Sequence, residues 1–139
     1  MTIPVEYQRA SQQFEKFMLD ARDISGLATT NMVYNMVQGV LHAFRRRLNV
    51  RDAALFANVL PAVIRAIFVA DWNTDEPQRA FEDRVAMTKE VKALRAAHNF
   101  SPDTAIHDVA VALRRNIDQA ALDRVLAGLP QGAVEFWQD

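Results

Sequence analysis

Apolar residues recur at three- and four-residue spacing along most of the chain, which is the period of amphipathic α-helices. The first stripe predicts a helix from about residue 5 to residue 24, and Gly26 ends it. A second helix begins after a cap at Thr29 or Thr30, and its stripe continues to Leu48. No segment alternates apolar and polar positions for long enough to form a strand. The pattern therefore predicts an all-α fold.

Capping residues and a proline divide the rest of the first half. Asn49, with Asp52 three residues later, is a candidate N-cap for a short helix that ends at Leu60. Pro61 cannot donate a helical hydrogen bond, so we expect a break there and a new helix that continues to about Ala70. The polar residues 73–80 are then expected to connect the two halves.

The second half follows a similar order. Its first helix is expected over about residues 81–97, and Ser101-Pro102-Asp103 has the composition of a helix start. The helix that follows is expected to be about one turn shorter than its counterpart in the first half. Asp118 is a candidate cap for the next helix, which Gly128 ends, and Pro130 opens a last turn or two.

The two halves also match in sequence. The residues of Ala43–Leu48 return in similar form as Ala112–Ile117, an offset of 69 positions, and Leu60-Pro61 returns as Leu129-Pro130 at the same offset. This match makes Phe44 and Leu113 equivalent core positions. The sequence predicts two tandem repeats of about four short helices each, because neighbouring repeats can bury their apolar faces on each other.

The length of 139 residues suits one compact domain, so both repeats are expected to share one core. The predicted domain is 1–139, with repeat one over about 5–72, the connector over 73–80, and repeat two over about 81–137.

Three segments of the first half resemble a known family: Gly39–Leu48, Leu60–Arg65 and Ala70–Trp72. Together they are similar to the prokaryotic domain-of-unknown-function family numbered 2267. The similarity is clearest over 25–73 and looser over 95–137. The resemblance implies a small bacterial helical protein, and it supplies no catalytic or binding residues.

Composition and charge limit the function classes. The formal net charge is −1, which gives the molecule no general attraction for nucleic acid or an anionic membrane. The chain has no cysteine, which suits a reducing compartment. Its apolar stretches are too short for a membrane span, and the N-terminus lacks the pattern of a signal peptide. A cytoplasmic protein is expected.

Candidate catalytic chemistry is sparse. The three histidines, His42, His98 and His107, lack the spacing that places two imidazoles on one helix face for a metal. The sequence predicts that His42 makes a hydrogen bond at the surface. Neighbouring carboxylates fall on polar stretches, and four glycines form no phosphate or dinucleotide loop. No metal, cofactor or catalytic residue is predicted.

The densest charge cluster is Arg45-Arg46-Arg47 with Arg51, and Arg114-Arg115 repeats it. Each cluster lies near the end of its predicted helix, where a cation favours the helix dipole, and we interpret Arg45, Arg46 and Arg47 as mainly solvated. Two tryptophans close the halves and are expected to pack in the core, with an exposed aromatic groove as the alternative. The candidate interaction surface comprises Arg45, Arg46, Arg51, Trp72, Arg114, Arg115 and Trp137.

The sequence predicts a well-defined helical scaffold and contains no recognisable catalytic motif. This combination favours a non-catalytic module that binds a partner protein or a second copy of itself. The alternative is a small-molecule or enzymatic pocket between the two repeats, built from dispersed polar residues. A third hypothesis, nucleic-acid binding through Arg45–Arg47, is disfavoured by the net charge.

Overall fold

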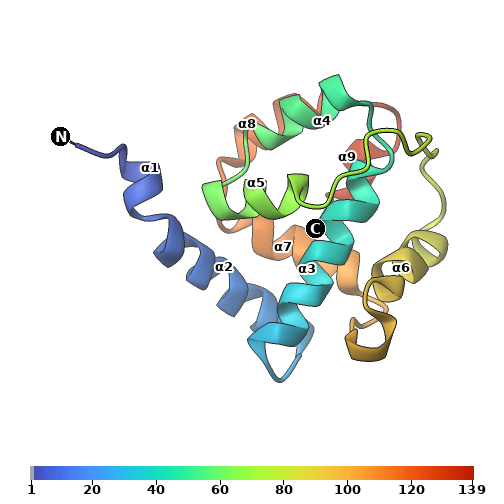
Figure 1. Cartoon of the computed structure of the whole chain (residues 1–139), viewed down its shortest axis with the longest axis horizontal. Helices are drawn as coiled ribbons and strands as arrows, with labels where there is room; N and C mark the ends of the chain where they lie inside the picture. Colours follow the sequence, from blue (N-terminus) through green and yellow to red (C-terminus); the bar gives the residue numbers. More distant parts are fainter. Residues whose placement is uncertain (1) are drawn as a thin grey trace.

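A computed structural model describes residues 2–139, and within that range the regular structure is helical, with no strand (Figure 1). This confirms the predicted all-α class. The α-helices are α1 (Val5–Gln8), α2 (Ala10–Ser25), α3 (Thr30–Arg45), α4 (Val50–Ala57), α5 (Ala62–Val69), α6 (Arg84–Ala93), α7 (Ala105–Arg114), α8 (Gln119–Ala127) and α9 (Ala133–Phe136), and a 3-10 turn, η1, covers Ala96–His98.

Three predicted N-caps, each of which depends only on residues close by in the sequence, are confirmed. The side chains of Thr29, Asn49 and Asp118 each accept a hydrogen bond from the backbone amide three residues later, at 3.2, 2.8 and 3.1 Å. Gly26 ends α2 with a φ of 75°, a left-handed conformation that favours glycine.

Several predicted boundaries are wrong. The first helix is interrupted at Arg9, so α1 and α2 are separate helices and the expected total of eight becomes nine over residues 2–139. The helix expected over 81–97 extends only from Arg84 to Ala93, with Asp83 as its cap. Ser101 does not start a helix, because its hydroxyl bonds to Asn99 and α7 begins at Ala105. As a result α7 has 10 residues against 16 in α3, a larger difference than one turn.

The order of the helices fits two repeats of one plan. At the offset of 69, α2 to α5 correspond in turn to α6 to α9, and both Leu-Pro pairs lie between helices. The packing is reciprocal: α2 packs on α7, and α6 packs on α3 (Figure 1). The corresponding helices α3 and α7 also contact each other, as do α4 and α8. Each half therefore completes the core of the other.

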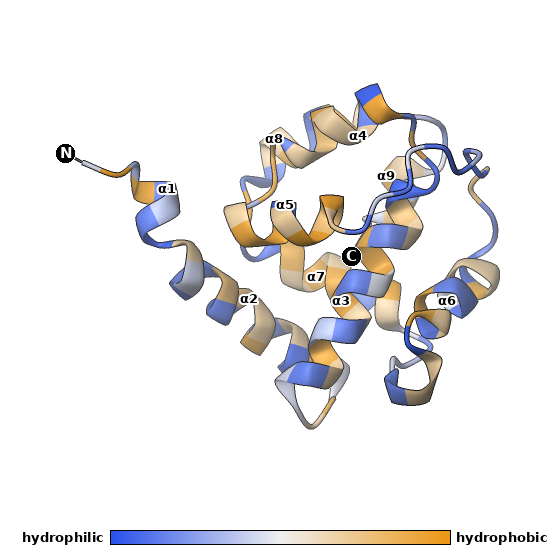
Figure 2. Ribbon diagram, viewed as in Figure 1, coloured by the Kyte–Doolittle hydropathy of each residue, from blue (hydrophilic) through white to orange (hydrophobic). Residues whose placement is uncertain are grey.

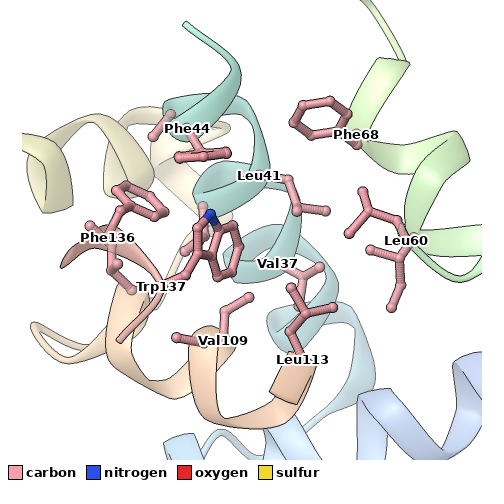
Figure 3. Packing of buried hydrophobic residues seen from close by; sticks show 14 of the residues in the cluster. Val37, Leu41, Phe44, Leu60, Phe68, Val109, Leu113, Phe136 and Trp137 are labelled. Carbon is pink, nitrogen blue, oxygen red and sulfur yellow. The ribbon is translucent and has the colours of Figure 1, made fainter. Parts of the chain in front are cut away.

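The core draws its side chains from both halves, and Figure 2 shows apolar positions turned inward on the helices around it. Phe44 is fully buried, with its ring centroid 4.7 Å from that of Phe56 and 5.0 Å from that of Phe136. Trp137 points into the same region, between the two halves (Figure 3). Its equivalent in the first half is Phe68, which is also fully buried. Leu113, the predicted counterpart of Phe44, is buried as expected.

One glycine fixes the approach of α6 to α3. A Cβ atom on Gly39 would lie 2.8 Å from the carbonyl oxygen of Val91 in α6, which is too close for any side chain. The equivalent position in α7 is Asp108, so the two halves do not bring their helix pairs equally close at this point.

Candidate functional site

The arginines of the candidate interaction surface do not lie where the sequence predicted. Arg45 is 6% exposed, Arg47 is fully buried, and Arg114 is 9% exposed. The interpretation that the cluster is mainly solvated is therefore wrong for Arg45 and Arg47. Arg46 is partly exposed, and the three guanidinium groups do not form one exposed basic surface.

Arg45 and Arg114 hold the last helix of their own halves. The Nη1 atom of Arg45 donates to the carbonyl oxygens of Phe68 and Ala70, at 2.7 and 2.9 Å, where α5 ends. The Nε atom of Arg114 donates to the carbonyl oxygen of Trp137 at 2.7 Å, just after α9. Phe68 and Trp137 are equivalent positions, so both arginines satisfy the same carbonyl.

Arg47 and its equivalent Asn116 hold the first helix of the other half. Arg47 donates to the carbonyl oxygen of Ala43 at 2.8 Å and forms a two-bond ion pair with Glu90 of α6. Asn116 donates to the carbonyl oxygen of Ala112 at 2.8 Å and to Asp20 of α2 at 2.8 Å. Arg47 and Asn116 therefore stabilise the packing of α6 on α3 and of α2 on α7.

Beside Arg45 the structure contains a cavity of about 220 Å³, which we name the arginine cavity. It lies between the end of α3, the start of α4 and the chain that follows α5. Its lining residues are Arg45, Arg46, Leu48, Asn49, Val50, Trp72, Asn73, Thr74, Glu76, Pro77 and Gln78. The cavity brings together Arg45, Arg46 and Trp72, three residues of the predicted interaction surface.

Arg45 is the buried cation of the arginine cavity. Its guanidinium lies over the ring of Trp72, with the central carbon 5.3 Å from the ring centroid. Arg45 forms no ion pair with any carboxylate among residues 2–139, and its Nε and Nη2 atoms donate no hydrogen bond to the described chain. Burial, together with the charge of Arg46, lowers the pKa of Arg45 to about 10.

Arg46 is the second cation of the cavity and is more loosely held. Its nitrogens lie 3.6 Å from Glu76 and 3.6 Å from Glu90, both longer than a charge-assisted hydrogen bond. Glu76 is the one carboxylate among the lining residues, and its side chain is 40% exposed. The cavity therefore presents two cations and one weakly held anion.

The other predicted surface residues lie elsewhere. Trp137 is fully buried, so the expectation of core packing is confirmed for it and it cannot contribute to an exposed surface. Trp72 is partly buried and packs against the core. Arg51 and Arg115 are exposed, on α4 and after α7. The seven predicted residues do not form one surface.

Two buried polar residues were missed or misplaced by the sequence. His42 is buried, not at the surface, and its Nε2 atom lies 3.0 Å from the carbonyl oxygen of Ile67; burial lowers its pKa to about 4. Asp108 is 3% exposed, burial raises its pKa, and its carboxylate accepts a hydrogen bond from Thr104 at 2.8 Å. Asp108 does not line the arginine cavity.

A second feature is the apolar surface at the N-terminal end. Residues 2–8, which we name the N-terminal arm, lead away from the body (Figure 1) and expose Ile3, Val5 and Tyr7 by more than half. Its contact with the body outside α2 includes a long hydrogen bond, 3.5 Å, from Arg65 to the hydroxyl of Tyr7.

Beside the arm, between α2 and α3, lies an apolar groove of about 300 Å³. Its lining residues are Ser11, Phe14, Glu15, Met18, Leu19, Thr30, Asn31 and Tyr34. The arm of the same chain does not line it.

Over residues 2–139, no group of three or more histidine, aspartate or glutamate side chains is placed to hold a metal ion. Within the same range, no helix is long and apolar enough to cross a membrane.

Comparison with known proteins agrees with the resemblance seen in the sequence. The curated proteins include no match to this chain. A family model described as "Uncharacterized conserved protein (DUF2267)" matches residues 14–136, which include the arginine cavity and both halves of the core. The chain therefore belongs to this DUF2267 family.

Proposed function

We propose that the protein is a non-catalytic interaction module whose partner is a second copy of the same chain. The observation that carries this proposal is the N-terminal arm, whose apolar side chains have no cover within their own chain. A short segment that exposes Ile3, Val5 and Tyr7 is costly to leave in water, and burial against a partner removes that cost.

The apolar groove supports a second copy as the occupant. The groove is lined by Phe14, Met18, Leu19 and Tyr34, and its own arm leaves it open. Each chain thus carries both an uncovered apolar segment and an apolar groove. Two copies that exchange arms would fill both grooves at once, as a two-fold symmetric interface requires.

Charge supports the same pairing. Arg9 follows the arm and Glu15 lines the groove, and neither forms an ion pair in the described chain. In the exchanged arrangement Arg9 of each copy approaches Glu15 of the other. Such a pair at the rim contributes more to orientation than to affinity.

The proposed setting is the cytoplasm of a bacterium. The absence of cysteine suits a reducing compartment, and the net charge of −1 favours a protein partner over nucleic acid. The two repeats act in this proposal as one body that carries the arm.

Sedimentation velocity over a wide concentration range tests self-association. We expect a reversible dimer with a Kd in the micromolar range, because the arm and groove form a small interface. Val5→Asp and Leu19→Asp should each shift the protein to the monomer. Val85→Asp is the matched control, since Val85 is 68% exposed on α6, outside both the arm and the groove.

A charge exchange sharpens the test. Arg9→Glu and Glu15→Arg should each weaken the dimer, and the double variant should restore it, because the pair is re-formed with reversed signs. A wild-type protein that stays monomeric up to millimolar concentration would contradict the proposal. Equal effects of Val5→Asp and Val85→Asp on the dimer would contradict the assigned surface.

A further inference from the structure

We propose that the arginine cavity is a binding site for a phosphate group, presented either as inorganic phosphate or as a small phosphate ester. The proposal does not depend on self-association, since none of the lining residues belongs to the N-terminal arm or the apolar groove. It rests on the cavity itself, on a buried arginine with free donors, and on a difference between the two halves.

The buried arginine is the central observation. Arg45 is 94% buried, since 6% of it is exposed, and it lines the cavity. Its Nη1 atom is used by the carbonyls of Phe68 and Ala70, while Nε and Nη2 have no acceptor in the described chain. Both nitrogens keep contact with solvent, so an anion in the cavity can accept hydrogen bonds from them. Glu76 and Asp71 act on the charge of Arg45, but neither forms an ion pair with it in the described chain.

Other donors around the cavity suit an anion with several oxygens. Arg46 adds a second guanidinium that is held only at 3.6 Å by its carboxylate partners. Among residues 2–139 the Thr74 hydroxyl has no hydrogen-bond partner, and the Asn73 side chain uses only its oxygen, which accepts from the amide of Asp75. The start of α4, at Asn49 and Val50, adds the positive end of a helix dipole, which Asp52 in the first turn partly offsets. Phosphate can accept from several such donors at once, and arginine matches its geometry.

Glu76 is the group that opposes the proposal, and it also provides a test. It is the one carboxylate among the lining residues, and its distance of 3.6 Å from Arg46 marks a loose pair. A bound phosphate must compete with this carboxylate for Arg46. Removing the charge of Glu76 should therefore tighten binding.

The second half shows that an arginine at the position of Arg45 can have an ion-pair partner. Arg114 makes the same carbonyl contact as Arg45, but its Nη1 atom also pairs with Asp123 at 3.0 Å. The residue equivalent to Asp123 in the first half is Ala54, which has no charge. The first half thus lacks the ion-pair partner that Asp123 supplies in the second half, and its arginine lines the arginine cavity.

The cavity has room for a group much larger than one water molecule. Its volume of about 220 Å³ is several times the roughly 30 Å³ share of one water molecule. Trp72 lines the remaining space and offers an aromatic surface to a small organic group. A phosphate ester with a planar group should therefore bind more tightly than inorganic phosphate.

Isothermal titration calorimetry tests the site with two probes, inorganic phosphate and phenyl phosphate, each against chloride at matched ionic strength. We expect one binding site per chain for both probes, with phenyl phosphate the tighter. Tryptophan emission gives an independent signal, because Trp72 lies beside Arg45 and Trp137 is buried in the core. The change in emission should disappear in Trp72→Phe.

Three variants assign the binding to the cavity. Arg46→Gln should weaken phosphate binding about tenfold, because one guanidinium is lost. Arg115→Gln is the matched control, since Arg115 is the exposed equivalent of Arg46 in the second half and makes the same charge change. Glu76→Gln should tighten binding several-fold. Circular dichroism melts check that each variant is folded, and Arg45 itself is left unchanged because it also holds α5.

The competing results are distinct. No heat and no change in emission with either probe at millimolar concentration would overturn the proposal. Equal weakening by Arg46→Gln and Arg115→Gln would show general attraction of anions to the surface and would also overturn it. If inorganic phosphate binds but phenyl phosphate does not, the site takes the free ion, and the role given to Trp72 is wrong. These results leave the oligomeric state untouched, so they are separable from a failure of self-association.

Discussion

Arg45 and Arg114 occupy the same place in the two halves and donate to the same carbonyl, yet the surroundings of their remaining nitrogens differ. Arg114 is paired with Asp123, whose side chain is 61% exposed. Arg45 has no carboxylate partner in the described chain and lies against Trp72 at the arginine cavity. The shared contact is structural, because it satisfies the carbonyls at the end of the last helix of each half.

The two halves differ at the arginine cavity, so the first half can bind a ligand there that the second half does not. Residues 70–80 follow α5 and contribute Trp72, Asn73 and Thr74 to the cavity. In the first half this segment lies beside the arginine, whereas in the second half the largely exposed Asp123 pairs with the arginine.

The largest expected effect concerns the core positions Phe44 and Leu113. Phe44→Ala should lower the free energy of unfolding by about 3–5 kcal/mol, because it removes a ring packed on several other aromatic rings. Leu113→Ala should cost about 2–4 kcal/mol, since its side chain is smaller. Urea denaturation measures both. A cost below about 1 kcal/mol at either site would show that the two halves do not share one core.

The second prediction concerns His42, whose equivalent in the second half is Val111. Burial lowers the pKa of His42 to about 4, from an ordinary value of 6.5. Between these two pH values the unfolded chain binds a proton that the folded chain does not, so stability falls as the pH falls. Relative to His42→Val, the wild type should lose roughly 3 kcal/mol from pH 7 to pH 4.

Denaturant melts of the wild type and of His42→Val across this pH range give that difference. The carboxylates titrate in both proteins, so their contributions to the pH dependence cancel. His42→Gln serves as the control, because it retains a donor for the carbonyl of Ile67 without a titrating ring. Parallel curves for the wild type and both variants would contradict a buried neutral histidine.

The smallest expected effect belongs to the ion pair that distinguishes Arg114. Asp123→Asn should lower the free energy of unfolding by less than about 1 kcal/mol, because Asp123 is largely exposed and the pair is screened by solvent. Added salt should make the difference in unfolding free energy between the wild type and Asp123→Asn still smaller. A loss above about 2 kcal/mol would mean that Arg114 depends on its counterion for stability, and that Arg45 carries a larger cost than its contacts indicate.

Features that depend only on neighbouring residues could be predicted from the sequence. The apolar stripes, the caps at Thr29, Asn49 and Asp118, and the stop at Gly26 are local, since each involves groups within about one helical turn. The offset of 69 also identified Phe44 and Leu113 as equivalent buried positions. The start of α7 was missed because Ser101 bonds to Asn99 instead of capping a helix.

The burial of the arginines and of His42 depends on tertiary contacts that the sequence pattern does not show. The carbonyls that bind Arg45 and Arg114 lie 23 or more residues further along the chain, and Glu90 lies 43 residues from Arg47. A periodic pattern marks these positions as polar, so the sequence predicted solvated cations. Burial became favourable because helix ends from distant segments present unsatisfied carbonyl groups to the guanidinium groups, and no local pattern records that arrangement.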